Sequence, residues 1–246
     1  MDSSPLLCLD NLTKEYRSGE GTFFALRNVD ASFASKGLIL ISGKSGSGKS
    51  TLLNLIAGII KPSRGHVVYR GKDIRGMDDK ALSRYRNKEI GIVFQHYNLF
   101  EHQSVLFNIV LPLLIGGGKI IASFERGEML LDQYGMSSLK ASLVSALSGG
   151  EKQRVAILRA LIAIPSIILA DEPTGALDRA NAARVMNILS TIAEERLVIV
   201  VSHDLELVRR YATRHIAISD GRIISDSLAE KAADEPHGQK RADQLA

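Results

Sequence analysis

Nine residues near the start of the chain combine glycines, a lysine and hydroxyl groups at a spacing typical of a phosphate-binding loop. They follow the pattern G-x-x-x-x-G-K-[ST] and are Gly43, Lys44, Ser45, Gly46, Ser47, Gly48, Lys49, Ser50 and Thr51. Glycines permit positive φ and let successive backbone N–H groups face phosphate oxygens. We expect Lys49 to reach the β- and γ-phosphates of a nucleotide, and the Ser50 hydroxyl to bind Mg²⁺.

The segments on either side of this loop have the composition of a buried strand and a buried helix. Residues 38–42 (LILIS) form a short apolar run, as in a buried parallel strand. Residues 51–57 (TLLNLIA) predict a buried helix that ends near Gly58, and its positive end adds to the attraction for phosphate. The alternative is a Gly/Ser-rich linker that contains a lysine, which does not account for the strand and the helix.

An acidic pair follows a second apolar run. Residues 167–170 (IILA) precede Asp171 and Glu172, and the carboxyl ends of parallel strands meet at one edge of a sheet. We therefore expect both carboxylates near the phosphate loop, with Asp171 holding Mg²⁺ directly or through water. Glu172 would orient and deprotonate an attacking water. The alternative is an acidic pair that faces solvent at a strand end.

The composition is that of an ordinary globular chain of 246 residues, with 45% hydrophobic and 24% charged residues. A net charge of +4 does not argue for a nucleic-acid partner. Cys8 is the only cysteine, which excludes an intramolecular disulfide and fits a reducing cytosol. The longest apolar run, residues 105–115, contains Asn108 and Pro112 and is too short to cross a bilayer, so we expect no insertion into a membrane.

The periodicity predicts an α/β core with an N-terminal antiparallel β subdomain and an inserted α-helical subdomain at about residues 96–164. The expected strands are residues 6–16, 23–26, 29–33, 38–42, 90–94, 167–171 and 197–202, with hairpins at 66–74 and 215–224. The expected helices are residues 51–57, 78–87, 104–115 (bent or ended near Pro112), 123–134 (capped by Ser123), 148–164, 180–195 and 205–211. Residues 227–246 are polar, and we expect them to be disordered.

One octapeptide points to a family. Residues 147–154 (LSGGEKQR) predict a helix start able to bind an anion, although the phosphate loop already supplies a nucleotide site. Lying after that loop and just before the strand at 167–171, the octapeptide resembles the signature of ATP-binding-cassette (ABC) ATPases. The resemblance extends to about Ile224. It implies a P-loop NTPase (RecA-like) core, one ATPase domain over residues 1–226, ATP and Mg²⁺ as cofactors, and ATP hydrolysis.

The resemblance also implies roles for single residues. Tyr16 resembles the aromatic residue that stacks on adenine, although it could be an ordinary strand tyrosine. Gln95 matches the glutamine that senses Mg²⁺ and the attacking water, and Asp178 is similar to the aspartate of a loop that crosses to a partner. His203 resembles the switch histidine that touches the γ-phosphate. The other histidines are interpreted as structural or surface residues: His66, His96, His102, His215 and His237.

In this family the active unit is a head-to-tail pair of ATPase subunits. The resemblance implies that Ser148, Gly149 and Gly150 of one subunit close over the γ-phosphate bound by the other subunit's phosphate loop. We expect the partner to be a second copy of this chain, and a related chain is the alternative.

Residues 171–178 (DEPTGALD) have Gly175 where many members of the family have serine. They resemble the branch that works with macrolide-export, antimicrobial-peptide-export and lipoprotein-release permeases, as do residues 86–91 and 111–114. This implies a cytoplasmic ATPase subunit on the inner face of the cell membrane. It would power a separate integral membrane permease, which would export or extract a peptide, lipid-like or drug-like substrate and dock near residues 95–114.

Two alternatives belong to other classes. One is a soluble ABC ATPase that acts on ribosomes or DNA, but a single cassette without heptad insertions argues against it. The other is an ATP-binding sensor module of a permease complex without turnover. The complete set of proposed catalytic residues argues against this second alternative: Lys49, Gln95, Asp171, Glu172 and His203.

Overall fold

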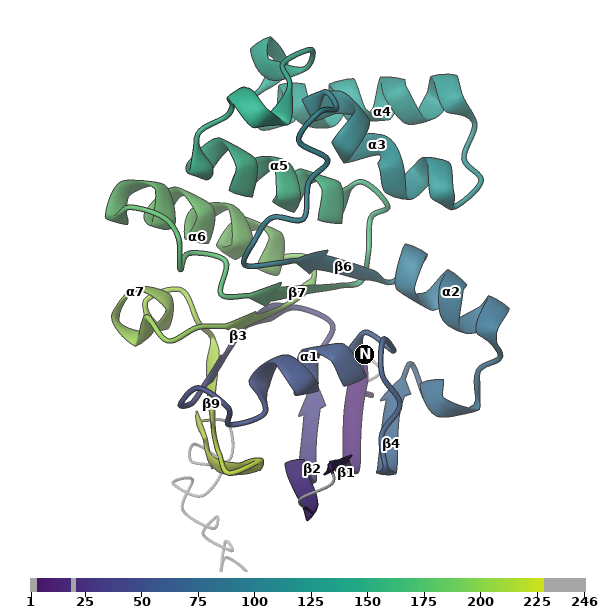
Figure 1. Ribbon diagram of the computed structural model, residues 1–246, viewed down its shortest axis with the longest axis vertical. Helices are drawn as coiled ribbons and strands as arrows, with labels where there is room; N and C mark the ends of the chain where they lie inside the picture. The colour runs from purple at the N-terminus through teal and green to yellow at the C-terminus, as the bar shows by residue number, and fades with distance from the viewer. Residues whose placement is uncertain (1–3, 19–20, 228–246) are drawn as a thin grey trace, which may run out of the picture.

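Two β-sheets and the helix between them form the core that positions the phosphate loop (Figure 1). The computed structural model describes residues 4–18 and 21–227. The smaller sheet is antiparallel, with strand order β2-β1-β4-β5, and consists of β1 (Leu7–Ser18), β2 (Gly21–Phe33), β4 (Arg64–Tyr69) and β5 (Lys72–Asp73). The N-terminal antiparallel sheet predicted from the sequence is therefore present.

The larger sheet has strand order β10-β9-β3-β8-β7-β6. Its strands are β3 (Gly37–Ser42), β6 (Ile90–Val93), β7 (Ile167–Asp171), β8 (Leu197–Val201), β9 (Arg214–Ser219) and β10 (Arg222–Asp226). All neighbours are parallel except β10, which pairs with β9 as an antiparallel hairpin. The carboxyl ends of the parallel strands consequently lie at one edge, as the sequence predicted.

Helices cover both faces of the larger sheet. They are α1 (Lys49–Ile56), α2 (Asp79–Lys88), α3 (Val105–Ile115), α4 (Ile120–Gln133), α5 (Gly149–Leu161), α6 (Arg179–Ala193) and α7 (Leu205–Arg209), with 3₁₀ turns at Ile74–Gly76, Ser137–Leu139 and Val144–Ala146. Ile39 and Ile41 of β3 pack with α1 and the antiparallel sheet, whereas Leu38 and Leu40 pack with α5 and α6. This alternation is the period of two expected for a strand that is buried on both faces.

Two predictions about local structure are wrong. The separate strands expected at residues 23–26 and 29–33 form one strand, β2, and Asn28 takes a left-handed φ of 46° within it. The Thr13 hydroxyl and the Asn28 side chain lie 3.0 Å apart at this point, where the pairing with β1 shifts register. The irregularity is thus absorbed as a bulge and does not end the strand.

The helical part, at the top of Figure 1, consists of α3, α4 and α5. Helix α3 continues past Pro112 to Ile115, and Asn87 Nδ2 donates to the Pro112 carbonyl oxygen at 2.9 Å. Ser123 does not cap α4, which begins three residues earlier at Ile120. The Ser123 hydroxyl instead donates to the Lys119 carbonyl oxygen at 2.9 Å, an i−4 bond that serine can make inside a helix.

Among the residues that the structure describes, no helix is both long and apolar enough to span a bilayer. The predicted tail at residues 227–246 lies, apart from Ser227, outside the described residues.

Candidate functional site

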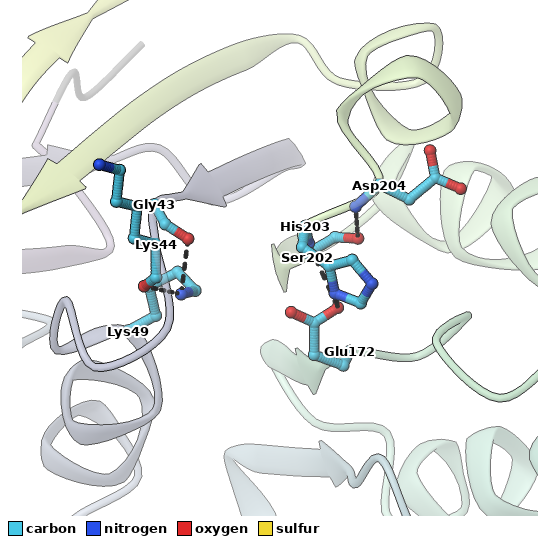
Figure 2. Close-up of polar contacts among 7 residues, drawn as sticks. All are labelled: Gly43, Lys44, Lys49, Glu172, Ser202, His203 and Asp204. Carbon is cyan, nitrogen blue, oxygen red and sulfur yellow. Dashed lines mark hydrogen bonds and ion pairs between the residues drawn. The ribbon is translucent and has the colours of Figure 1, made fainter.

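The phosphate loop lies between the carboxyl end of β3 and the start of α1. Helix α1 begins at Lys49, and its N-cap Gly48 has φ 103° and forms no side-chain cap. The backbone N–H groups of the first turn are therefore available to an anion. Lys49 Nζ donates to the carbonyl oxygens of Gly43 and Lys44, each at 2.8 Å, which holds the ammonium group across the loop (Figure 2).

Close packing explains two of the glycines in the motif. A Cβ atom on Gly43 would lie 2.2 Å from the Ile218 carbonyl oxygen, and a Cβ atom on Gly48 would lie 2.2 Å from the Ala25 carbonyl oxygen. Because both contacts are with backbone, neither neighbour can move aside cheaply. The tertiary structure therefore excludes side chains at these two positions.

Glu172 and His203 face each other across the carboxyl edge of the larger sheet. Glu172 Oε2 lies 2.8 Å from His203 Nδ1 and accepts from the His203 backbone N–H at 3.3 Å (Figure 2). The Glu172 side chain is 14% exposed, and its backbone has a left-handed φ of 48°. A non-glycine residue in that region is strained, and such strain tends to persist at functional sites.

Asp171 is half-buried at the end of β7. Burial raises the pKa of its carboxyl group, and the charge of Glu172 raises it further, whereas a hydrogen bond from Ser50 and the charge of Lys49 lower it. The net direction is upward, so the ionised form lacks sufficient positive charge nearby. A divalent cation would supply that charge. The donors Ser50, Asp171 and Gln95 all offer oxygen atoms, the ligands that Mg²⁺ prefers.

A cavity of about 470 Å³ brings most of the predicted site residues together. Its lining comprises Tyr16, Phe23, Ala25, Gly43, Ser45, Gly46, Gly48, Lys49, Ser50, Thr51, Gln95, Asp171, Glu172, Val201 and His203. Lys44 and Ser47 are absent from this lining, although the Lys44 carbonyl oxygen holds Lys49. A larger cavity of about 670 Å³, between α4 and the ends of α5 and α6, contains none of the predicted residues.

Phe23 is a lining residue that the sequence analysis missed. It pairs with Tyr16 across β1 and β2, and both rings are exposed, at 58% for Phe23 and 44% for Tyr16. Two exposed aromatic side chains at the rim of a phosphate site suit a nucleobase. The pairing of the two strands was the signal that could have identified Phe23.

Ser148, Gly149, Gly150 and Asp178 lie outside this cavity. Ser148 caps α5 in a capping box with Glu151, and Asp178 caps α6 by accepting from the N–H groups of Ala180 and Asn181. A Cβ atom on Gly150 would lie 2.7 Å from the Asn181 side chain, so the two helix starts are in contact. The hydrogen bonds from the start of α6, chiefly from Asn181, lower the pKa of Asp178.

Arg159 of α5, the helix that begins at the signature, binds the loop after Gln95. The sequence analysis did not identify this residue. Arg159 donates to the carbonyl oxygens of Tyr97 (2.7 Å) and Asn98, residues with left-handed φ of 59° and 50°. Burial of the guanidinium lowers the pKa of Arg159. Beside it lies a groove of about 240 Å³, lined by α2, β6, Asn98, Pro112 and α5 residues.

Comparison with known proteins agrees with this geometry. Residues 26–175 match the family model described as ABC transporter. The uncharacterized ABC transporter ATP-binding protein MJ0796 of Methanocaldococcus jannaschii is 39% identical over 224 residues, which cover 89% of this chain and 95% of that protein. Macrolide export ATP-binding/permease protein MacB 2 of Aeromonas hydrophila is 39% identical over 232 residues, or 94% of this chain and 36% of that protein. The chain thus spans about a third of the length of such export ATP-binding/permease relatives.

Solved structures show the same likeness. The dimeric post-hydrolysis state of the ATP-binding cassette MJ0796, bound to ADP and Pi, has a TM-score of 0.81 at 36% identity, covering 89% of this chain and 97% of that one. The structure of cbiO1 from Clostridium perfringens, part of the ABC transporter complex cbiONQ, has a TM-score of 0.81 at 29% identity, covering 94% and 93%.

Proposed function

The chain belongs to the ABC transporter family, and from this premise we propose that it is the Mg²⁺-ATP-hydrolysing subunit of an exporter or extractor. The observation that carries the proposal is the single cavity lined by the phosphate loop, Gln95, Asp171, Glu172 and His203. The names of the export ATP-binding/permease relatives support the direction of transport. The substrate class would be peptides, lipid-like or drug-like molecules.

Each residue then has a defined task at the triphosphate. The backbone N–H groups at the start of α1 and the Lys49 ammonium group hold the β- and γ-phosphates. Ser50, Asp171 and Gln95 would hold Mg²⁺, which would supply positive charge to the triphosphate. Tyr16 and Phe23 flank the adenine.

Proton transfer falls to Glu172. Its carboxylate accepts a proton from the attacking water, and its contact with His203 Nδ1 orients that ring toward the γ-phosphate. The Glu172 side chain is mostly buried and lines the same cavity as the phosphate loop, so the base would lie close to a bound triphosphate. Positioning and electrostatics are the main sources of catalysis in phosphoryl transfer.

A second subunit completes the site. Ser148, Gly149 and Gly150 start α5 in contact with the start of α6 that Asp178 caps, and both lie away from the chain's own phosphate loop. We infer that this surface closes over the γ-phosphate held by a second copy of the chain, with Asp178 at the contact. The dimeric form of the MJ0796 cassette supports this inference.

The groove beside Arg159 would receive a helix of an integral membrane permease at the cytoplasmic face of the cell membrane. Arg159 contacts the loop that follows Gln95 and also lines the groove, so occupation of the groove can move Gln95. We further propose that residues 1–226 form one ATPase domain, with residues 96–164 as its inserted helical subdomain.

Phosphate release by the purified chain tests the ATPase proposal. We expect Mg²⁺-dependent turnover that Lys49→Ala abolishes. Lys140→Ala is the control and should preserve turnover, because Lys140 pairs with Glu128 of the helical part at 3.0 Å. ATP binding without turnover would instead favour a sensor module. Membrane fractionation of cells tests the partner, since recovery with ribosomes would favour a soluble ATPase.

A further inference from the structure

The hairpin formed by β9 and β10 follows the segment that matches the family model, yet it contacts the phosphate loop at two points and the residue just before the loop at a third. The Gly221 N–H donates to the Ser47 carbonyl oxygen at 3.2 Å. The Ile218 carbonyl oxygen lies so close to Gly43 that a Cβ atom there would be 2.2 Å away. His215 Nε2 lies 2.7 Å from Ser42 Oγ. This C-terminal hairpin therefore forms one wall of the loop.

The contact between His215 and Ser42 is the side-chain component of that wall. Ser42 is the last residue of β3 and is 4% exposed, and alternation along the strand places it on the same face as Leu40. Leu40 is the residue that pairs in register with His215 on β9. Ser42 is followed directly by Gly43, whose carbonyl oxygen accepts from Lys49 Nζ. His215 therefore contacts the residue that precedes Gly43, and the Gly43 carbonyl oxygen holds Lys49.

The second ring nitrogen of His215 contacts α7. Arg209 Nη2 lies 3.4 Å from His215 Nδ1, and a guanidinium group can only donate hydrogen bonds. If Nδ1 accepts this hydrogen bond, Nε2 carries the proton and donates to Ser42 Oγ. Arg209 ends the short helix that begins just after His203. A chain of polar contacts therefore joins the segment after His203 to the start of the phosphate loop.

We propose that His215 is a positioning residue for ATP binding. Through Ser42 it holds the β3 end of the phosphate loop in the conformation in which the Gly43 carbonyl oxygen orients Lys49. The proposal rests on ATP binding by this loop. His215 does not touch the nucleotide in this account, so its loss weakens binding and leaves the chemical step intact.

Steady-state kinetics of His215→Leu and Ser42→Ala test the proposal. Because a typical hydrogen bond contributes only modestly, we expect each change to raise the KM for ATP about two- to tenfold, with kcat within about twofold of wild type. The double variant should match either single variant, because both remove the same contact. His215→Gln, whose side-chain amide can donate to Ser42, should recover much of the lost affinity.

His66→Leu is the matched control, because His66 makes a similar 2.7 Å contact with Asp73 in the other sheet. It should leave the KM for ATP unchanged. An unchanged KM in Ser42→Ala, or additive effects in the double variant, would overturn the proposal even if His215→Leu fails to fold. Equilibrium ATP binding by the same variants separates this result from a failure of the ATPase proposal, which would abolish turnover in the wild-type chain.

Discussion

Replacement of Glu172 by glutamine separates chemistry from binding at this site. The amide has the size of the carboxylate and keeps an oxygen that can accept from the His203 backbone N–H. In the wild-type chain this N–H donates to Glu172 Oε2 at 3.3 Å. It cannot take a proton from water at neutral pH. General-base catalysis contributes about 10²–10⁴-fold in rate, so the barrier should rise by about 3–5 kcal/mol.

The same change should not weaken ATP binding. The charge of Glu172 raises the pKa of Asp171, so its removal favours the ionised form of Asp171 that binds Mg²⁺. We therefore expect a KM for ATP that is equal to or below the wild-type value. Gel filtration with Mg²⁺-ATP should show a stable dimer, since the γ-phosphate is retained.

The assay is phosphate release under saturating Mg²⁺-ATP, with nucleotide binding measured on the same preparation. Glu128→Gln is the matched control. Glu128 lies on α4, pairs with Lys140 at 3.0 Å and does not line the cavity. It should keep wild-type turnover. Turnover of Glu172→Gln within about tenfold of wild type, with ATP bound normally, would refute the assignment of Glu172 as the base.

Two further predictions concern stability. Burial raises the pKa of Asp171 in the folded chain. At a pH above the ordinary carboxyl pKa, the ionised Asp171 therefore destabilises the nucleotide-free fold. At a pH low enough to protonate Asp171 in both the folded and the unfolded state, this effect disappears. Asp171→Asn should therefore raise the Tm at neutral pH, but not in acid, and should remove the Mg²⁺ dependence of ATP binding; a lower Tm at neutral pH would contradict this. Ile164 is 54% exposed with a left-handed φ of 53°, and Ile164→Asn should stabilise the chain by about 1 kcal/mol, or about 2–4 °C in Tm. Ile59→Asn, at an isoleucine of similar exposure (49%) whose φ is not left-handed, should give no gain in thermal melts.

Local features were predictable because neighbouring residues determine them. Ser148 was expected to start a helix and caps α5, whereas the helices expected at 51–57 and 180–195 begin slightly earlier, at Lys49 and Arg179. Predictions failed where a hydrogen bond, made across strands in one case and within a helix in the other, outweighed local preference. Asn28 stays within β2 because Thr13 on β1 satisfies its polar groups, and Ser123 lies within α4 because its hydroxyl finds an i−4 carbonyl oxygen.

The phosphate loop, the acidic pair and the signature were recognisable from residue types and spacing alone, because the chemistry of anion and Mg²⁺ binding requires those residues in that order. The sequence also predicted that the acidic pair lies near the phosphate loop, but only the tertiary structure decided the contacts among these residues, such as that between Glu172 and His203. Strand order in the larger sheet brings Lys49, Glu172 and His203 together and leaves the signature at a separate surface beside Asp178. Pairing of β1 with β2 in the smaller sheet sets Phe23 beside Tyr16, and pairing of β3 with β9 in the larger sheet sets His215 beside Ser42. The contact between His215 and Ser42 joins residues far apart in the sequence, and strand pairing between such segments leaves no periodic signal in either one.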